Sequence, residues 1–147
     1  MGASTQIPAR AANPLLEPSQ LPYGVVPFDR LQPSDYENAV REGIKQHIQE
    51  IDAITSNPES PTFENTIVAL DRSGSTLTIA QLALSNVEHA TGDTVLMRIT
   101  SELTPELTRH STDIMLNEKL WQRIKQVHAT FDRSKHDAED YMLLKST

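Results

Sequence analysis

Apolar residues recur at intervals of three and four along most of this chain, and no other sequence feature constrains its fold as strongly. Residues at these intervals lie on one face of an α-helix, whereas a half-buried strand requires alternation with a period of two. The longest candidate strand, residues 25–28, contains Pro27, which cannot donate a hydrogen bond to a neighbouring strand. The sequence therefore predicts an all-α protein with about six antiparallel helices.

The first helix is predicted to begin at a capping box, since Ser34 and Glu37 have the required spacing. It should end near Thr55. Glu37 and Arg41 are four residues apart in the order that favours an ion pair on the solvent face. Its predicted inner face consists of Tyr36, Val40, Ile44, Ile48 and Ile51.

Two shorter helices are expected next. Thr62 is the predicted N-cap of the second helix, which Ser73-Gly74 stops because glycine adopts a left-handed conformation without strain. Its predicted inner residues are Phe63, Ile67 and Leu70. The third helix covers roughly residues 75–90, and apolar stripes on two of its sides predict that it is the most buried element. The stripes are Leu77, Ala80, Leu84 and Val87 on one side, and Ile79, Leu82 and Ala83 on the other.

Asp93, Asn117 and Asp137 are the predicted N-caps of the last three helices. Pro105 could begin a new helix, but the apolar stripe keeps its phase on both sides of it, which favours one kinked helix. The predicted inner residues are Leu96, Ile99, Leu103, Leu107, His110 and Ile114 in the fourth helix, and Leu120, Trp121, Ile124, Val127, His128 and Phe131 in the fifth.

Six of the nine prolines fall within the first 33 residues, where they disfavour regular structure. Residues 1–12 are predicted to be a disordered lead-in. Residues 13–33 contain more apolar side chains than a solvated linker would carry, so they are predicted to form an ordered, irregular strap across the domain surface. The side chains expected to hold the strap are Leu15, Leu16, Leu21, Tyr23, Val25, Val26, Phe28 and Leu31.

Charge and composition argue against several classes of function. Thirteen basic and 20 acidic side chains give a net charge of −7, which disfavours nucleic acid and anionic membranes as partners. The chain has no cysteine for a disulfide, a thiolate metal site or a nucleophile. The sequence contains no run of about 18 apolar residues, which is the length that a membrane-spanning helix requires. The N-terminus lacks the apolar centre of a secretory signal, so a cytoplasmic location is expected, or a periplasmic one if a signal has been removed.

The five histidines do not form a recognisable metal-binding motif. A helical zinc site of the type H-E-x-x-H needs two histidines four residues apart, and no two here have that spacing. His110 with Asp113, and His128 with Asp132, are spaced for local hydrogen bonds. Otherwise ordinary surface or core-edge positions are expected for His47, His89, His110, His128 and His136.

The remaining candidates for chemistry are also better explained by structure. Glu102 and Glu106 are one helical turn apart, which fits a solvated acidic face better than a catalytic carboxylate pair. The acids within residues 137–140 are expected to stabilise a helix N-terminus. Trp121 is expected to be a core or interface residue. We therefore assign no catalytic, cofactor-binding or metal-ligating residue to this chain.

Three stretches of the sequence carry a resemblance to a known family. They are Asn13-Pro14-Leu15-Leu16 continuing to Pro27-Phe28-Asp29, then Asn57-Pro58 with Pro61-Thr62-Phe63-Glu64-Asn65-Thr66-Ile67-Val68-Ala69-Leu70, and Asp113-Ile114-Met115-Leu116-Asn117. Together they resemble the N-terminal helical region of bacterial peptidyl-dipeptidases, which are zinc metallopeptidases of the thimet-oligopeptidase type. The resemblance extends over roughly residues 13–145, and residues 13–147 are expected to be that helical segment.

The resemblance implies an all-helical enzyme whose zinc ion, held by an H-E-x-x-H motif and a further glutamate, activates water against a peptide bond. This chain lacks the motif. It is therefore expected to be an N-terminal fragment, inactive alone, that forms one wall of the substrate channel. Zinc, peptide substrates and the release of dipeptides from their C-terminus are expected only for the full-length protein with its catalytic domain.

A second hypothesis is a freestanding helical module for protein binding or regulation. The chain ends soon after a helix start, which favours truncation over this alternative. A truncated wall would expose apolar surface that the missing domain normally covers, so the fragment is expected to self-associate as a homo-oligomer.

Overall fold

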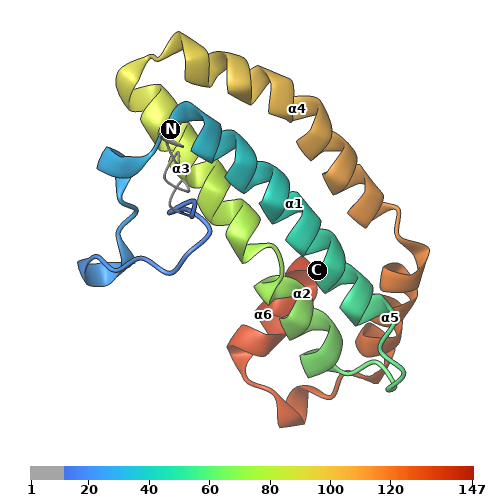
Figure 1. The fold of residues 1–147 in the computed structure, drawn as a ribbon. Coiled ribbons are helices and arrows are strands. Elements are labelled where there is room, and N and C mark those ends of the chain that lie inside the picture. The colour runs from blue at the N-terminus through green and yellow to red at the C-terminus, as the bar shows by residue number, and fades with distance from the viewer. Residues whose placement is uncertain (1–11) are drawn as a thin grey trace, which may run out of the picture.

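The computed structural model describes residues 12–147, which form packed helices and no strand (Figure 1). The all-α prediction is confirmed, while the predicted disordered lead-in, residues 1–12, lies outside the described residues except for Ala12. The longer helices are α1 (Pro33–Thr55), α3 (Ser75–Thr91), α4 (Thr94–Met115), α5 (Glu118–Thr130) and α6 (Ala138–Ser146). A π-type segment, η3 (Phe63–Val68), continues into α2 (Ala69–Arg72), and short 3-10 turns occur at η1 (Pro22–Gly24), η2 (Phe28–Arg30) and η4 (Arg133–Lys135).

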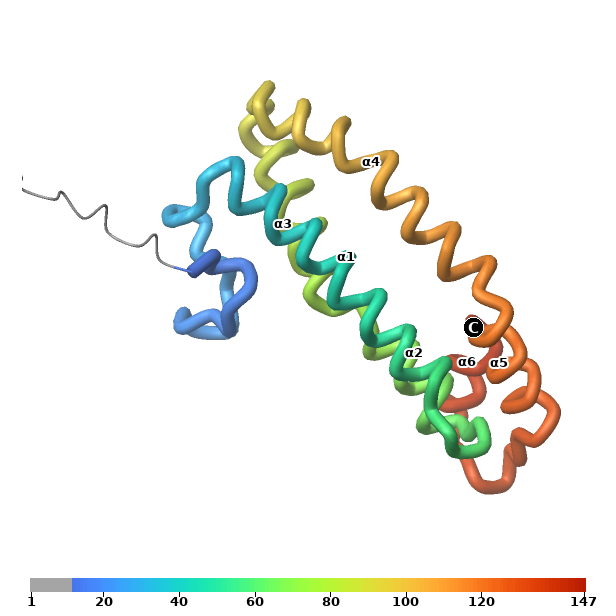
Figure 2. The backbone as a smooth tube through the Cα atoms, turned by 45° about the vertical axis from the view of Figure 1, so that its right-hand side comes forward, coloured from blue at the N-terminus to red at the C-terminus, as the bar shows by residue number. Residues whose placement is uncertain are grey.

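The three longest helices, α1, α3 and α4, lie side by side, and successive ones run in opposite directions (Figure 2). One apolar cluster joins them, and a second forms where the C-terminal end of α1 meets η3, α5 and α6. The first cluster consists of Leu15, Tyr36, Ala39, Val40, Leu77, Ala80, Ala83, Leu84, Leu96, Ile99 and Leu103. The second consists of Ile51, Ile54, Phe63, Ile67, Leu120, Ile124, Val127 and Leu144. Helix α1 contributes to both clusters and therefore connects the two ends of the molecule.

The start of α1 differs from the predicted capping box at Ser34 and Glu37. Pro33 takes the first helical position, which suits its fixed φ and its lack of an amide donor. The N-cap is consequently Gln32, whose backbone amide donates to the Asp35 carboxylate at 2.8 Å. The other predicted caps are confirmed, since a side-chain oxygen accepts backbone amides at Thr62, Asp93, Asn117 and Asp137.

The inner face of α1 was predicted wrongly at one position. Ile48 is 47% exposed, whereas Gly43 is buried and His47 is half-buried. A Cβ atom added to Gly43 would lie 2.6 Å from Cα of Leu77, so α1 and α3 approach each other backbone to backbone at this point. The inner face therefore depends on a residue without a side chain and on a polar residue.

Helix α3 is not buried on two sides as predicted. Leu77, Ala80 and Leu84 are buried, but Ile79 and Leu82 are about half exposed, at 49% and 57%. The reason is that α3 packs on α1 and α4, and both contacts lie on the same side of the helix as the first apolar cluster. Ala83 of the second stripe is buried as well, so the uncovered apolar face of α3 consists of Ile79 and Leu82.

Helix α4 continues through Pro105 as a single helix, as predicted. Proline cannot donate to the carbonyl of Ser101 one turn earlier, so the helix continues with one backbone hydrogen bond missing. On α5 the prediction is wrong for Trp121, which is 49% exposed, and for His128, which is exposed. Arg123 is buried instead.

The strap is ordered and irregular, as predicted, but it is held by fewer side chains than expected. Leu15 is buried and Val26 and Leu31 are half-buried. The other five predicted anchors, which are Leu16, Leu21, Tyr23, Val25 and Phe28, are exposed. The middle of the strap folds on itself, with the Ser19 hydroxyl donating to the Val25 carbonyl, and so projects from the helices (Figure 1).

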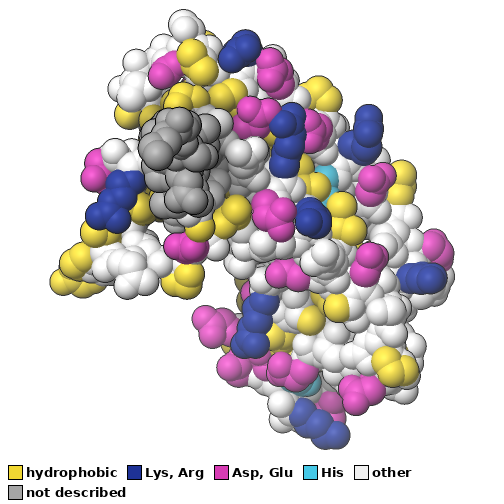
Figure 3. Space-filling view, in the orientation of Figure 1, with side chains coloured by type: hydrophobic (Ala, Val, Ile, Leu, Met, Phe, Trp, Pro, Cys, Tyr) yellow, Lys and Arg dark blue, Asp and Glu magenta, His cyan; other side chains and the backbone are white. Residues whose placement is uncertain are grey.

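Apolar side chains gather on the projecting part of the strap, while acidic and basic side chains are interspersed over the helices (Figure 3). No helix in the part of the chain that the structure describes is both long enough and apolar enough to cross a bilayer.

Candidate functional site

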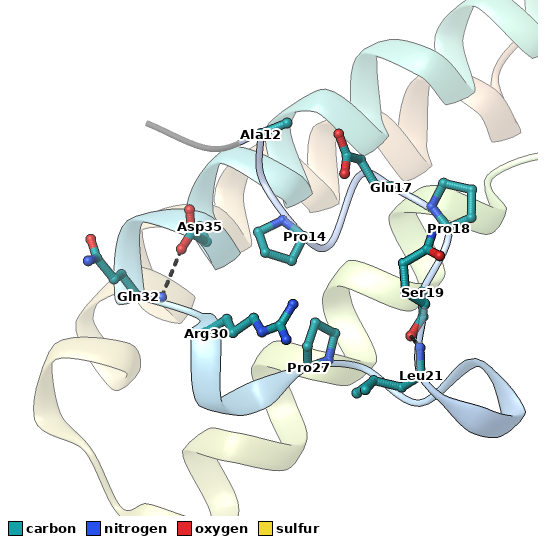
Figure 4. Close-up of a pocket in the computed structure, with 11 residues that line it drawn as sticks. Ala12, Pro14, Glu17, Pro18, Ser19, Leu21, Pro27, Arg30, Gln32 and Asp35 are labelled. Carbon is teal, nitrogen blue, oxygen red and sulfur yellow. Dashed lines mark hydrogen bonds between the residues drawn. The ribbon is translucent and has the colours of Figure 1, made fainter. Parts of the chain in front are cut away.

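A hollow of about 570 Å³ lies between the strap and the start of α1 (Figure 4). Prolines from the strap frame it, and in this view the Arg30 side chain extends between Pro14 and Pro27. The Asp35 carboxylate is committed to the Gln32 amide at 2.8 Å. The lining residues are Ala12, Pro14, Glu17, Pro18, Ser19, Gln20, Leu21, Pro27, Arg30, Gln32 and Asp35. This mixture of prolines and a few charged side chains offers a surface for contact but no catalytic arrangement.

A second polar cluster lies where α1, α4 and the turn between α2 and α3 meet. His47 of α1 and His110 of α4 are joined by a hydrogen bond of 2.9 Å between Nδ1 of His47 and Nε2 of His110. The other ring nitrogen of His47, Nε2, lies 3.0 Å from the Ser73 hydroxyl. That hydroxyl in turn lies 2.6 Å from the carbonyl of Leu70.

This row of hydrogen bonds defines where the protons are. The Ser73 hydroxyl must donate to the Leu70 carbonyl, since a carbonyl only accepts, and it therefore accepts from Nε2 of His47. A neutral His47 then has a free lone pair on Nδ1, which accepts the Nε2 proton of His110. Each contact is satisfied when both imidazoles are neutral.

Burial favours the same neutral state. His110 is 7% exposed and His47 is half-buried. Loss of solvation lowers the pKa of both imidazoles below the ordinary value of 6.5, and the neighbouring His110 lowers the pKa of His47 further. Glu50 opposes the shift at His47, and Asp113 opposes it at His110.

A serine beside two histidines also resembles an activated nucleophile, but the surroundings do not suit one. The Ser73 proton is directed to a backbone carbonyl rather than to His47. The adjacent Gly74 amide, which could stabilise an oxyanion, donates instead to the Glu50 carboxylate at 2.6 Å, and that negative charge would repel an oxyanion. The cluster can bind and release protons, but it is not arranged for acyl transfer.

Neither of the two local histidine–aspartate hydrogen bonds that the spacing would allow is formed among the described residues. His110 bonds to His47 on another helix and not to Asp113. Helix α5 ends at Thr130, so Asp132 lies beyond the turn that would bring it to His128, and it accepts from Ser134 at 3.0 Å. Of the other histidines, His89 bonds to the carbonyl of its own helix at Ser85 and His136 pairs with Asp140.

Glu102 and Glu106 do not act as a pair. Glu106 of α4 binds Arg41 of α1 at 2.9 Å, and Arg41 also contacts Glu37, which confirms the predicted pair within α1. The Arg41 guanidinium lowers the pKa of Glu106. Both partners are exposed, so this link between α1 and α4 contributes little to stability.

A catalytic zinc ion requires three protein ligands that converge on one point. Within residues 12–147, no three histidine, aspartate or glutamate side chains are placed to hold a metal ion. The described residues therefore do not fit such an ion.

No protein-family model matches the chain. Two curated proteins are similar to it, and both are named dipeptidyl carboxypeptidase. The one from Salmonella typhimurium is 37% identical over 117 residues, which are 80% of this chain and 17% of that protein. The one from Escherichia coli K12 is 35% identical over 133 residues, which are 90% of this chain and 20% of that protein. The chain thus spans about a fifth of the length of these relatives.

Proposed function

This chain is a homologue of the bacterial dipeptidyl carboxypeptidases over most of its own length, and from that premise we propose that it is a structural segment of such a peptidase. The observation that carries the proposal is the unequal coverage. The similarity extends over 80% and 90% of this chain but over only 17% and 20% of the two relatives. A segment of this size would contribute part of the enzyme's framework, and the rest of the polypeptide would contribute the reaction.

The proposed role of the segment is to form one wall of a channel that admits short peptides, from whose C-terminus the whole enzyme releases dipeptides. The arrangement of α1, α3 and α4 supports this role, because one apolar cluster joins three long helices into a stiff layer. A stiff wall excludes folded proteins by its shape and needs no reactive group of its own. Any catalytic zinc ion would be held by residues other than those described.

The uncovered apolar side chains fit a segment that packs against further protein. Ile79 and Leu82 lie on the open face of α3. Met115, Leu116 and Trp121 surround a shallow hollow of about 290 Å³ where α4 meets α5, and all three are at least 49% exposed. We propose that the remainder of the peptidase covers these positions, because monomeric proteins seldom leave such clusters in water.

The proposal is tested by assaying the purified chain for peptide cleavage and bound zinc. We expect the chain to show no chelator-sensitive release of dipeptides from short peptides. Elemental analysis should find no zinc bound in a one-to-one ratio. The full-length Escherichia coli relative, assayed in parallel, is the positive control. Chelator-sensitive release of dipeptides by this chain alone would contradict the proposal.

The chain is also expected to self-associate in solution through its uncovered apolar side chains. Light scattering over a wide concentration range should show a mass that rises with concentration. The double substitution Leu116→Gln and Trp121→Gln should weaken association several-fold, whereas Lys119→Gln, on the solvent-exposed part of α5, should leave it unchanged. A single monomeric species at every concentration would instead favour a freestanding helical module.

A further inference from the structure

We propose that His47 and His110 form a pH-operated clasp between α1 and α4, which is closed while both imidazoles are neutral and opens when the pair takes up protons. The clasp consists of these two side chains and the Ser73 hydroxyl that orients His47. It does not depend on the proposed peptidase role, because it follows from contacts within this chain.

The geometry limits how many protons the clasp can hold. Only one proton fits between Nδ1 of His47 and Nε2 of His110, which are 2.9 Å apart. A first added proton can bind Nδ1 of His110 and leave this hydrogen bond intact. A second must bind Nδ1 of His47, where it would face the Nε2 proton of His110. Two donors cannot share one hydrogen bond, so the second proton breaks the contact.

Two carboxylates near the clasp favour protonation of its imidazoles and so oppose the effect of burial. Glu50 faces the clasp from α1 and Asp113 from α4. Glu50 is held in place by the Gly74 amide at 2.6 Å and cannot follow a moving imidazole without breaking that bond. The residues that α3 and the preceding turn add to the surrounding cavity carry no ionisable charge; they are Ser73, Gly74, Leu77, Thr78 and Gln81.

The position of the clasp determines which part of the molecule would move. The N-terminal half of α4 is anchored by three buried residues, Leu96, Ile99 and Leu103. Its C-terminal half has the two half-buried residues Leu107 and Ile114 on either side of His110. The other polar link between the helices, Arg41 to Glu106, is exposed. Opening the clasp should therefore loosen the C-terminal half of α4 around His110, while its N-terminal half stays packed and the second apolar cluster continues to hold α5 through Leu120.

The sign of the pH dependence follows from the lowered pKa values of the two imidazoles. The unfolded chain binds protons at about the ordinary pKa of 6.5, and the folded chain binds them only at lower pH. The contribution of the clasp to stability is therefore complete above 6.5 and is lost as the pH falls below it. We expect the folded-to-unfolded ratio to fall by roughly three- to tenfold per pH unit below 6.5 on account of the pair.

The first test compares urea unfolding between pH 7.5 and 5.0 for the native chain and for His47→Gln with His110→Gln, which removes both titrating groups. The double variant should lose most of the fall in stability. The matched control His128→Gln removes an exposed histidine and should keep the native fall. Equal pH dependence in the native chain and the double variant would overturn the proposal.

A second test needs neither histidine to be replaced and holds even if the double variant does not fold. The chain has no cysteine, so spin labels can be attached at Gln49→Cys on α1 and Thr112→Cys on α4, both exposed positions. The distance between the labels should lengthen from pH 7.5 to 5.0, with a midpoint that matches the imidazole titration followed by NMR. A distance that stays constant, or imidazoles of His47 and His110 that titrate above 6.5, would refute the clasp.

Discussion

Replacing Arg123 with methionine should lower the free energy of unfolding by about 3 kcal/mol, the largest effect we expect from any single substitution in this chain. Arg123 is only 8% exposed and lies on α5 among the residues of the second apolar cluster. Its guanidinium donates to the carbonyls of Asn57 and Glu59 at 3.0 and 3.3 Å and to the side-chain oxygen of Asn65 at 3.1 Å. One side chain thus holds the loop after α1, the start of η3 and α5 together.

The size of the effect comes from the acceptors that would be left behind. Methionine fills a similar volume but donates nothing, so two backbone carbonyls lose this donor in a part-buried position, at about 1 kcal/mol or more for each group that water cannot reach. The Asn65 oxygen also accepts the Thr62 amide at 2.7 Å, so the start of η3 loses support as well.

Two further variants distinguish this explanation from a general effect of charge. Arg123→Lys keeps the charge but cannot reach three acceptors from one ammonium group, so its loss in unfolding free energy should be smaller but still measurable. Lys125→Met removes an exposed charge from the same helix and should change the unfolding free energy by less than about 0.5 kcal/mol. Equal losses from Arg123→Met and Lys125→Met in urea titrations would show that the contacts of Arg123 are unimportant.

The parts of this fold that sequence predicted well are those determined by neighbours in the chain. The caps at Thr62, Asp93, Asn117 and Asp137 each need an acceptor two or three residues before the amides it serves, so local spacing is sufficient. The continuity of α4 through Pro105 was predictable for the same reason, because the phase of its apolar stripe is a local property.

The polar residues inside the fold could not be predicted, because their partners are distant in the sequence. No local pattern marks Arg123 as a buried residue, because its carbonyl acceptors lie 64 and 66 residues earlier. The sequence predicts an ordinary surface or core-edge position for His47, because the partner that explains its position, His110, is 63 residues away. The signal that the sequence offers is the predicted inner position of His110 in its helix, and that position does not identify a partner.

Apolar residues were overpredicted for a related reason. Ile48 of α1 and Ile79 and Leu82 of α3 have the residue types of a core, but burial depends on whether another element covers that side. Sequence periodicity shows which residues share a helical face. It does not show how many faces of the helix have a neighbour.

Gly43 illustrates the opposite case, a position that sequence gives no reason to notice and that the packing makes irreplaceable. Gly43→Ala should lower the free energy of unfolding by about 1 to 2 kcal/mol, because the added methyl group overpacks the contact between α1 and α3. In an exposed helix the same change is stabilising by about 1 kcal/mol, since alanine is the better helix former. Here the new Cβ atom would lie 2.6 Å from Cα and 2.9 Å from the amide nitrogen of Leu77, so α1 and α3 must separate. Overpacking of this kind costs about 1 to 3 kcal/mol and can exceed that.

The nearest atoms to the Cβ atom added at residue 43 belong to the backbone of α3, so the clash cannot be relieved by shortening a side chain. Leu77→Ala in the Gly43→Ala background should therefore give no rescue, and the two losses in unfolding free energy should at least add. Ser101→Ala, at an exposed position of α4, is the matched helical control and should be neutral or slightly stabilising. If Gly43→Ala left the urea midpoint unchanged or raised it, as is expected of that control, the close approach of α1 and α3 would be wrong, and with it the placement of His47 one turn further along the same face.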